Sequence, residues 1–142
     1  MSARNVTLLV VDDDDIDRMA VRRGLKKLGL SNDLVEASDG LAALDLLRGA
    51  KDQAPLEKPY IILLDINMPR MNGIEFLDEL RADPKLRYTP VFVWSTSSAD
   101  ADKTRAYERG VAGYLVKGDC GADLSEALQL LKSYWETVQL PA

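Results

Sequence analysis

The stretch VTLLVVDDDD, residues 6–15, joins a nearly continuous apolar run to four aspartates. Valine and threonine make up most of the run, which is typical of a strand that is buried on both faces of a parallel sheet. A second apolar run, YIILLD at residues 60–65, also ends in an aspartate. Two buried strands that both end in carboxylates indicate that acidic side chains gather at one edge of a sheet.

Amphipathic stretches alternate with short β-rich runs along the rest of the chain. From Ile16 to Leu28, apolar residues recur at three- and four-residue spacing, which predicts a helix that ends at Gly29. The same patterns predict strands at residues 33–37, 90–94 and 113–117, and helices at residues 41–47, 74–80, 99–109 and from about Ala122 onward. Gly73 is expected to occupy a turn that needs a positive φ. Five strand–helix units favour an α/β fold, a doubly wound parallel sheet with helices on both faces.

Composition limits the possible classes of protein. With 142 residues, 46% of them apolar and 29% charged, the chain is expected to form one globular domain over residues 1–142, with its core at about 5–138. A net charge of −5 without a basic run makes nucleic acid an unexpected partner. The absence of histidine excludes Ser-His-Asp and Cys-His catalysis, and Cys120 alone cannot form an internal disulfide. No apolar run could span a membrane and the N-terminus lacks a signal-peptide pattern, so a cytoplasmic location is expected.

Polar residues follow four of the five predicted strands. Because ligands bind beyond the carboxyl ends of parallel strands, we expect Asp12, Asp13, Asp65, Ser95 and Lys117 to share one crevice. Carboxylates about 4 Å apart repel by roughly 4 kcal/mol per pair at an effective dielectric near 20, so the site needs a cation or it will hold protons. An all-oxygen ligand set favours Mg²⁺ or Mn²⁺. Carboxylates can accept phosphoryl groups, whose charge a lysine and a hydroxyl can neutralise.

Together these motifs resemble the receiver domain of two-component response regulators. The resemblance rests on Asp12-Asp13, on residues 64–73 (LDINMPRMNG), on Ser95 and on residues 113–117 (GYLVK), and it covers residues 5–138. It implies a flavodoxin-like fold with five helices and a five-stranded sheet of strand order 2-1-3-4-5. It also implies that Asp65 accepts a phosphoryl group from a partner histidine kinase. Asp12 and Asp13 would hold Mg²⁺ together with Asp65 and the backbone carbonyl of Asn67.

The resemblance also assigns a switch. Ser95 would be the hydroxyl that moves to the phosphoryl group, Lys117 the cation that contacts the group, and Tyr114 the aromatic rotamer switch linked to Ser95. Receivers usually place proline after the lysine, often through a cis peptide bond, whereas this chain has Gly118. In this respect, in its long loop before the third strand and in the tryptophan of its last helix, the chain resembles single-domain regulators that serve bacterial phytochromes.

The last predicted helix carries a wide apolar face. One stripe consists of Leu124, Leu128, Leu131, Trp135 and Val138, and a second of Ala127, Leu130 and Tyr134. The two stripes cover roughly 160°, whereas contact with one core needs about 100°. This favours homodimerisation through the helix, with a deeper groove in the core as the alternative.

We therefore predict a stand-alone phosphoacceptor, since no output domain is expected after the last helix. It would act through phosphorylation-dependent protein binding or relay to a histidine phosphotransfer protein. It would not be an enzyme, beyond self-phosphorylation from small phosphodonors and autodephosphorylation. One alternative is a phosphorylation-independent docking module. Another is a Mg²⁺-dependent phosphatase whose nucleophile lies in the Asp12-x-Asp14 motif, while Asp14, Asp15 and Asp17 are otherwise interpreted as capping or surface residues.

Overall fold

The computed structural model describes residues 5–50, 52–118 and 124–141, and strands and helices alternate along them. The strands are β1 (Thr7–Val11), β2 (Leu34–Ala37), β3 (Tyr60–Leu64), β4 (Val91–Ser95) and β5 (Gly113–Val116). The helices are α1 (Asp15–Lys27), α2 (Gly40–Arg48), α3 (Gly73–Ala82), α4 (Asp100–Glu108) and α5 (Ser125–Thr137). Each predicted element is present with small shifts at its ends. The expected helix start near Ala122, and Cys120, lie outside the described residues.

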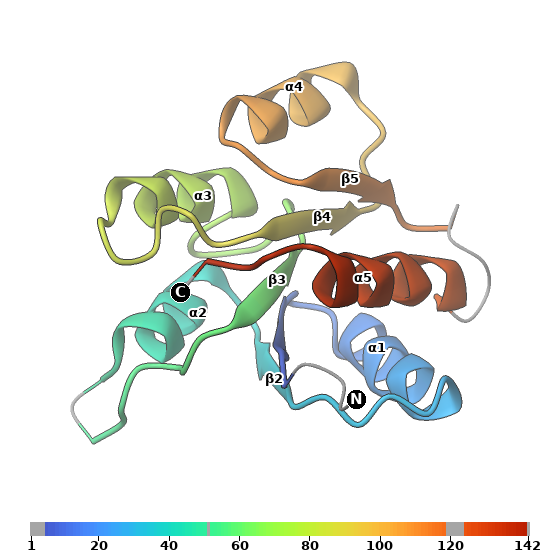
Figure 1. The fold of residues 1–142 in the computed structure, drawn as a ribbon. Coiled ribbons are helices and arrows are strands. Elements are labelled where there is room, and N and C mark those ends of the chain that lie inside the picture. The colour runs from blue at the N-terminus through green and yellow to red at the C-terminus, as the bar shows by residue number, and fades with distance from the viewer. Residues whose placement is uncertain (1–4, 51, 119–123, 142) are drawn as a thin grey trace.

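The five strands form one parallel sheet in the order β2-β1-β3-β4-β5, as Figure 1 shows. This confirms the flavodoxin-like fold that the resemblance implied. Val11, the last residue of β1, is in register with Leu64, the last residue of β3. The amide of Asp65 donates a hydrogen bond to the carbonyl of Val11 at 2.9 Å. The register therefore brings the residues that follow β1 and β3 to the same edge of the sheet.

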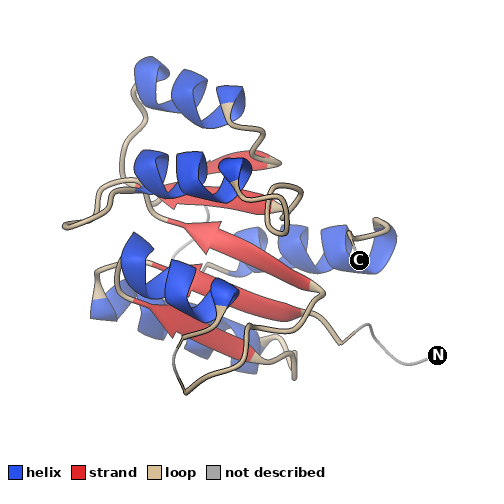
Figure 2. Cartoon of the chain, turned by 90° about the vertical axis from the view of Figure 1, so that its left-hand side faces the viewer, coloured by secondary structure: helices blue, strands red, loops and turns tan. Residues whose placement is uncertain are grey.

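Helices cover both faces of the sheet (Figure 2). Successive residues of β3 point to opposite faces, so Ile62 and Leu64 belong to one buried apolar cluster and Ile61 and Leu63 to another. Buried side chains of α2, α3 and α4 complete the first cluster, and those of α1 and α5 complete the second. Apolar burial on both faces explains why the central strands β1, β3 and β4 are nearly continuous apolar runs.

The apolar stripes of two helices are narrower in the structure than in the sequence. Ile16 was expected on the buried side of α1, but it lies in the first turn and is 74% exposed. On α5 the first stripe is buried up to Trp135, and Tyr134 of the second stripe packs edge-to-face on Phe92, with ring centroids 5.0 Å apart. Leu130 is the large apolar residue that α5 leaves exposed, at 47%. Within the described residues, no helix has the length and apolar character needed to cross a membrane.

Gly73 does not have the positive φ that we expected. It is the first residue of α3, and a Cβ atom there would lie 2.5 Å from the carbonyl oxygen of Asp65. Glycine is thus required by the close approach of α3 to the end of β3. The left-handed conformation in this loop belongs to Arg70, with a φ of 66°.

At the amino ends of β4 and β5, one guanidinium binds four backbone carbonyls. Arg81, near the end of α3, donates to the carbonyl of Arg109 at 2.7 Å and to that of Gly110 at 3.2 Å. It also donates to the carbonyls of Arg87 at 2.7 Å and Thr89 at 2.8 Å. We call this group the Arg81 cluster. It joins α3 to the segments that lead into β4 and β5, and it stabilises the end of the sheet opposite Asp65.

Candidate functional site

Three aspartates meet at the carboxyl ends of β1 and β3. Asp12, Asp13 and Asp65 each offer an oxygen, and these oxygens lie within 4.8 Å of one another. Asp12 is 1% exposed and Asp65 is 6% exposed, whereas Asp13 is open to solvent. We call these three residues the carboxylate cluster. The structure brings together the acidic side chains that the sequence placed at one sheet edge.

Burial and mutual repulsion make the carboxylate cluster electrostatically unfavourable. Burial raises the pKa of Asp12 to about 6, although hydrogen bonds from Lys117 and Asp14 act in the opposite direction. Burial also raises the pKa of Asp65, against the attraction of Lys117 and hydrogen bonds from neighbouring amides. Buried carboxylates at such short separations can be stabilised by a cation or by protons. Because all three ligands are hard carboxylate oxygens, they fit Mg²⁺ or Mn²⁺.

Lys117 reaches this cluster from the end of β5. Its Nζ lies 2.8 Å from Asp12 Oδ2 and 3.6 Å from Asp65 Oδ2. A third carboxylate, Asp17 of α1, accepts a hydrogen bond from the same Nζ at 2.7 Å. Burial alone would lower the pKa of Lys117, but the hydrogen bonds to Asp12 and Asp17, together with the attraction of Asp12 and Asp65, raise the pKa above its ordinary value. The sequence-based interpretation missed Asp17, which it treated as a capping or surface residue.

The backbone after Lys117 differs from the usual receiver pattern. The Lys117–Gly118 peptide bond is trans, since the cis bond found among the described residues is the one before Pro59. Gly118 has a φ of 95°, a conformation that favours glycine. The ammonium of Lys117 also lies 4.8 Å from the ring centroid of Trp94, which is buried at the end of β4. Lys117 is therefore held by side-chain contacts on several sides.

Ser95 and Tyr114 meet through the loop that follows β4. The Ser95 side chain is fully buried, and its Oγ accepts a hydrogen bond from the amide of Ser97 at 3.2 Å. The Tyr114 hydroxyl donates to the Ser97 carbonyl at 2.9 Å. Ser97 Oγ in turn donates to Asp102 Oδ2 of α4 at 2.6 Å. A change at Ser95 could thus reach both β5 and α4 through one residue.

Two aspartates of the cluster differ in how strongly their oxygens are already bound. In Asp12, Oδ1 accepts from the Asp14 amide at 2.9 Å and Oδ2 from Lys117 at 2.8 Å. In Asp65, Oδ1 has a long contact of 3.4 Å with the amide of Asn67, and Oδ2 is 3.6 Å from Lys117. Weak contacts leave the lone pairs of Asp65 more available, which favours Asp65 over Asp12 as a nucleophile.

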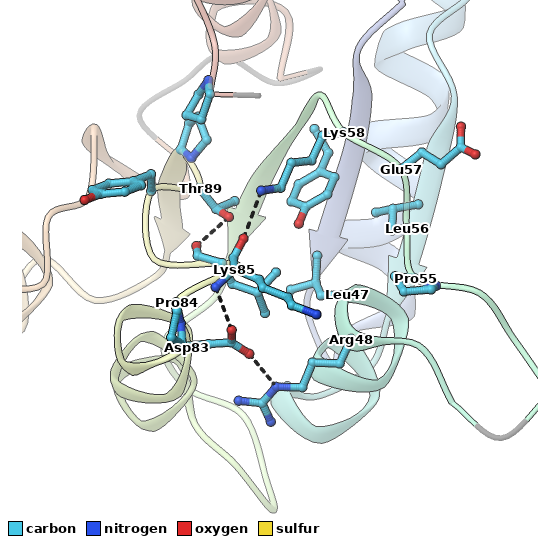
Figure 3. A pocket seen from close by; sticks show the side chains of 15 residues that line it. Leu47, Arg48, Pro55, Leu56, Glu57, Lys58, Asp83, Pro84, Lys85 and Thr89 are labelled. Carbon is cyan, nitrogen blue, oxygen red and sulfur yellow. Dashed lines mark hydrogen bonds and ion pairs between the residues drawn. The ribbon is translucent and has the colours of Figure 1, made fainter.

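A cavity of about 980 Å³ lies at the other end of the sheet (Figure 3). Its wall includes Tyr60 and Pro90, at the amino ends of β3 and β4, whereas Asp65 and Ser95 lie at the carboxyl ends of these strands. Asp83 in this wall binds Arg48 at 3.1 Å. The cavity is therefore separate from the carboxylate cluster.

Comparisons with known proteins agree with the geometry. The family model of the response regulator receiver domain matches residues 8–129. Response regulator Rcp1 of Synechocystis sp. is 37% identical over 136 residues, which are 95% of this chain and 92% of Rcp1. The crystal structure of the Mn(2+)-bound form of Rcp1 superposes with a TM-score of 0.83 at 36% identity and covers 96% of this chain and 99% of that one. The phosphorylated cyanobacterial phytochrome response regulator RcpA gives a TM-score of 0.85 at 30% identity, with 96% and 98% of the two chains covered.

Proposed function

The chain belongs to the family of response regulator receiver domains, and we propose that it accepts a phosphoryl group on Asp65 from a partner histidine kinase. The observation that carries the proposal is the position of Asp65 beside Asp12, Asp13 and Lys117. Receivers of this kind serve two-component signalling, in which phosphorylation changes protein contacts.

In the proposed reaction, an Asp65 oxygen attacks the phosphorus of a phosphohistidine. The new P–O bond forms as the P–N bond breaks, and the imidazole nitrogen keeps the electron pair of the broken bond. Asp65 suits this role because its oxygens have long contacts, and Lys117 suits neutralisation of the transferred group because its Nζ lies 3.6 Å from Asp65. We assign the chain no further catalysis than self-phosphorylation from small phosphodonors and autodephosphorylation.

We propose that Asp12, Asp13 and Asp65, with the backbone carbonyl of Asn67, hold Mg²⁺, with Mn²⁺ as an alternative. Support comes from the spacing and the raised pKa of the carboxylates, and from the Mn²⁺-bound form of Rcp1. A bound Mg²⁺ would neutralise negative charge on the phosphoryl oxygens. The protein contributes three carboxylates, which lie together at the carboxyl ends of β1 and β3.

We propose that Ser95 and Tyr114 form the switch. Phosphorylation of Asp65 would draw the Ser95 hydroxyl toward the phosphoryl group. Ser95 Oγ would then leave the Ser97 amide, and Ser97 is the residue whose carbonyl holds the Tyr114 hydroxyl. The contact between Ser97 and Asp102 would transmit the change to α4.

We propose a bacterial phytochrome as the kinase partner. The support is similarity to RcpA and to RPA3017, a response regulator in red light signaling of R. palustris. RPA3017 is 37% identical to this chain and superposes with a TM-score of 0.83. A stand-alone role is supported by the match to nearly the whole of Rcp1. Such a protein would act in the cytoplasm as a single domain, through protein binding or through a histidine phosphotransfer protein.

We further propose that the chain forms a homodimer through the region of α5, where Leu130 remains exposed. Leu130→Glu should then give a monomer in light scattering at concentrations where the wild-type protein is dimeric. Identical masses for the two proteins would contradict this interface. Glu136→Gln, a change elsewhere on α5, is the matched control.

The test of the proposed function is phosphorylation by a small phosphodonor. With Mg²⁺ and acetyl phosphate, the intact mass of the wild-type protein should increase by one phosphoryl group. Asp65→Asn should show no increase, and EDTA should prevent it in the wild-type protein. An equal increase in Asp65→Asn would reject Asp65 as the acceptor, and no increase in the wild-type protein would support the docking-module alternative.

A further inference from the structure

Asp17 lies outside the carboxylate cluster, but it is the nearest partner of Lys117. Its Oδ2 is 2.7 Å from Lys117 Nζ, compared with 2.8 Å for Asp12 and 3.6 Å for Asp65. The Asp17 side chain is 26% exposed and that of Lys117 is 11% exposed, so water screens this contact only in part. The ion pair connects α1 to the end of β5, 100 residues along the chain.

The backbone of Lys117 is anchored, because its amide donates a hydrogen bond to the Ser95 carbonyl at 2.7 Å, but the long side chain leaves the ammonium free to move. Five single bonds separate Nζ from Cα, so the position of the ammonium depends on the side chains that it contacts. These are Asp12, Asp17 and the face of the Trp94 ring, 4.8 Å away.

The contacts of the ammonium define where its remaining hydrogen can point. An ammonium has three N–H groups at nearly tetrahedral angles. Two of them are donated, to Asp12 and Asp17, and the fixed direction of these two sets the direction of the third. The next nearest carboxylate oxygen is that of Asp65 at 3.6 Å, beyond hydrogen-bond distance. Among the described contacts, no carboxylate accepts the third N–H, and the nearest remaining carboxylate is that of Asp65.

We propose that Asp17 is a positioning residue: it holds Lys117 so that the free N–H faces the phosphoryl group that Asp65 receives. The proposal rests on the proposed function, because it assigns Asp17 a role in that same reaction. Asp12 belongs to the carboxylate cluster together with Asp13 and Asp65, so it is also a candidate ligand of the metal. Asp17 is the partner of Lys117 that stands apart from this cluster, so it can hold the ammonium without also serving as a ligand in the cluster.

The first test compares Asp17→Ala with Asp15→Ala. Asp15 is on the same helix, its side chain is 85% exposed and it pairs with Arg18, so its loss changes the charge without touching Lys117. With acetyl phosphate and saturating Mg²⁺, Asp17→Ala should slow phosphorylation about tenfold, which corresponds to about 1.4 kcal/mol of coupling. Asp15→Ala should stay within about twofold of wild type. Because Asp17 is not in the cluster, the Mg²⁺ concentration for half-maximal rate should not change.

A second readout needs neither metal nor phosphodonor. The chain has two tryptophans, so Trp135→Phe leaves Trp94 as the single reporter of the ammonium above its ring. In this background, Asp17→Ala should change the emission of Trp94, and Asp15→Ala should not. Asp17→Asn keeps the size of the side chain and should slow phosphorylation to a smaller extent, so the test remains valid if Asp17→Ala folds poorly.

Each outcome is decisive. A slower rate with unchanged Mg²⁺ dependence and a changed Trp94 emission supports the proposal. Wild-type rates in Asp17→Ala and Asp17→Asn, together with normal phosphorylation of Asp65, would overturn it and leave the proposed function intact. A wild-type protein that gains no phosphoryl group would overturn both.

Discussion

The two ends of the sheet differ in whether their charged side chains have complementary partners. At the amino ends of β4 and β5, Arg81 donates hydrogen bonds to four backbone carbonyl oxygens. At the carboxyl ends of β1 and β3, three carboxylates lie close together, and Lys117 contacts two of them, Asp12 and Asp65. One end has complementary partners for its charge, and the other has an excess of negative charge.

This difference indicates that the amino end of the sheet contributes to stability and the carboxyl end to function. Satisfied polar groups such as those of the Arg81 cluster stabilise a fold, whereas crowded carboxylates destabilise it unless something binds to them. The carboxylate cluster therefore marks the end of the sheet where a cation and a phosphoryl group are expected.

The Arg81 cluster should be the more sensitive of the two ends to loss of a side chain. Arg81→Ala leaves four carbonyls without their donor, and we expect the free energy of unfolding to fall by about 3 kcal/mol. Urea titration followed by circular dichroism measures this change. Arg48→Ala, which removes a partly exposed guanidinium that pairs with Asp83 and Glu79, should cost less than about 1 kcal/mol. Equal losses in the two variants would contradict the structural role of Arg81.

At the carboxyl end of the sheet, the carboxylate cluster should make the stability of the protein depend on pH. The pKa of Asp12 is about 6 in the folded protein against an ordinary value of 3.8, so the folded state binds this proton more tightly than the unfolded state. Stability from this group is greatest below about pH 4 and is lost as the pH rises through about 6. The raised pKa of Asp65 acts in the same direction.

Asp12→Asn isolates this effect. In EDTA, the variant should gain stability relative to the wild-type protein by on the order of 2 kcal/mol between about pH 4 and about pH 7. The chain has no histidine, so no imidazole titrates in this range. A stability difference that does not change with pH would show that the folded protein does not raise the pKa of Asp12.

Added Mg²⁺ should stabilise the carboxyl end without any help from the amino end. At a Mg²⁺ concentration about ten times the dissociation constant, the free energy of unfolding should increase by about 1.4 kcal/mol. Calorimetry with and without Mg²⁺ measures this gain. Arg81→Ala should keep the gain, because its defect lies at the far end of the sheet, and Asp13→Asn should lose it. The same gain in Asp13→Asn would mean that Mg²⁺ binds elsewhere.

The smallest effect is expected at the hydroxyl that joins β5 to the loop after β4. Tyr114→Phe removes the hydrogen bond to the Ser97 carbonyl and should cost about 1 kcal/mol of stability. The rate of phosphorylation should stay within about twofold, since among the described contacts Tyr114 does not touch the carboxylate cluster. Tyr107→Phe, at a 53% exposed tyrosine, is the control and should change neither quantity. A large loss of rate in Tyr114→Phe would place this residue in the chemistry itself.

The sequence was sufficient for the architecture because the central strands β1, β3 and β4 are buried on both faces. Continuous apolar runs such as Tyr60–Leu64 have few alternative structures, and the aspartates after them are placed by the sheet edge alone. Gly73 was recognised as a special position, but for the wrong reason. The need for glycine comes from the carbonyl of Asp65, and a contact between two elements cannot be read from a local pattern.

The role of Asp17 was hidden for a related reason. It belongs to an acidic run in which Asp14 caps α1 and Asp15 is exposed, so the local pattern explains all of these residues equally well. What distinguishes Asp17 is its contact with Lys117, which depends on how α1 lies against the end of β5. At Ile16 the local pattern misleads in the other direction: its spacing fits the apolar stripe of α1, but the side chain is exposed in the first turn.

The most direct test of the central claim is to identify the residue that carries the phosphoryl group. Protein treated with acetyl phosphate and Mg²⁺ can be reduced with borohydride, which converts a phosphorylated aspartate into homoserine, and the peptides can then be sequenced by mass spectrometry. We expect homoserine at position 65 and an unmodified carboxylate at positions 12 and 13. Homoserine at position 12 or 13, with Asp65 intact, would contradict it.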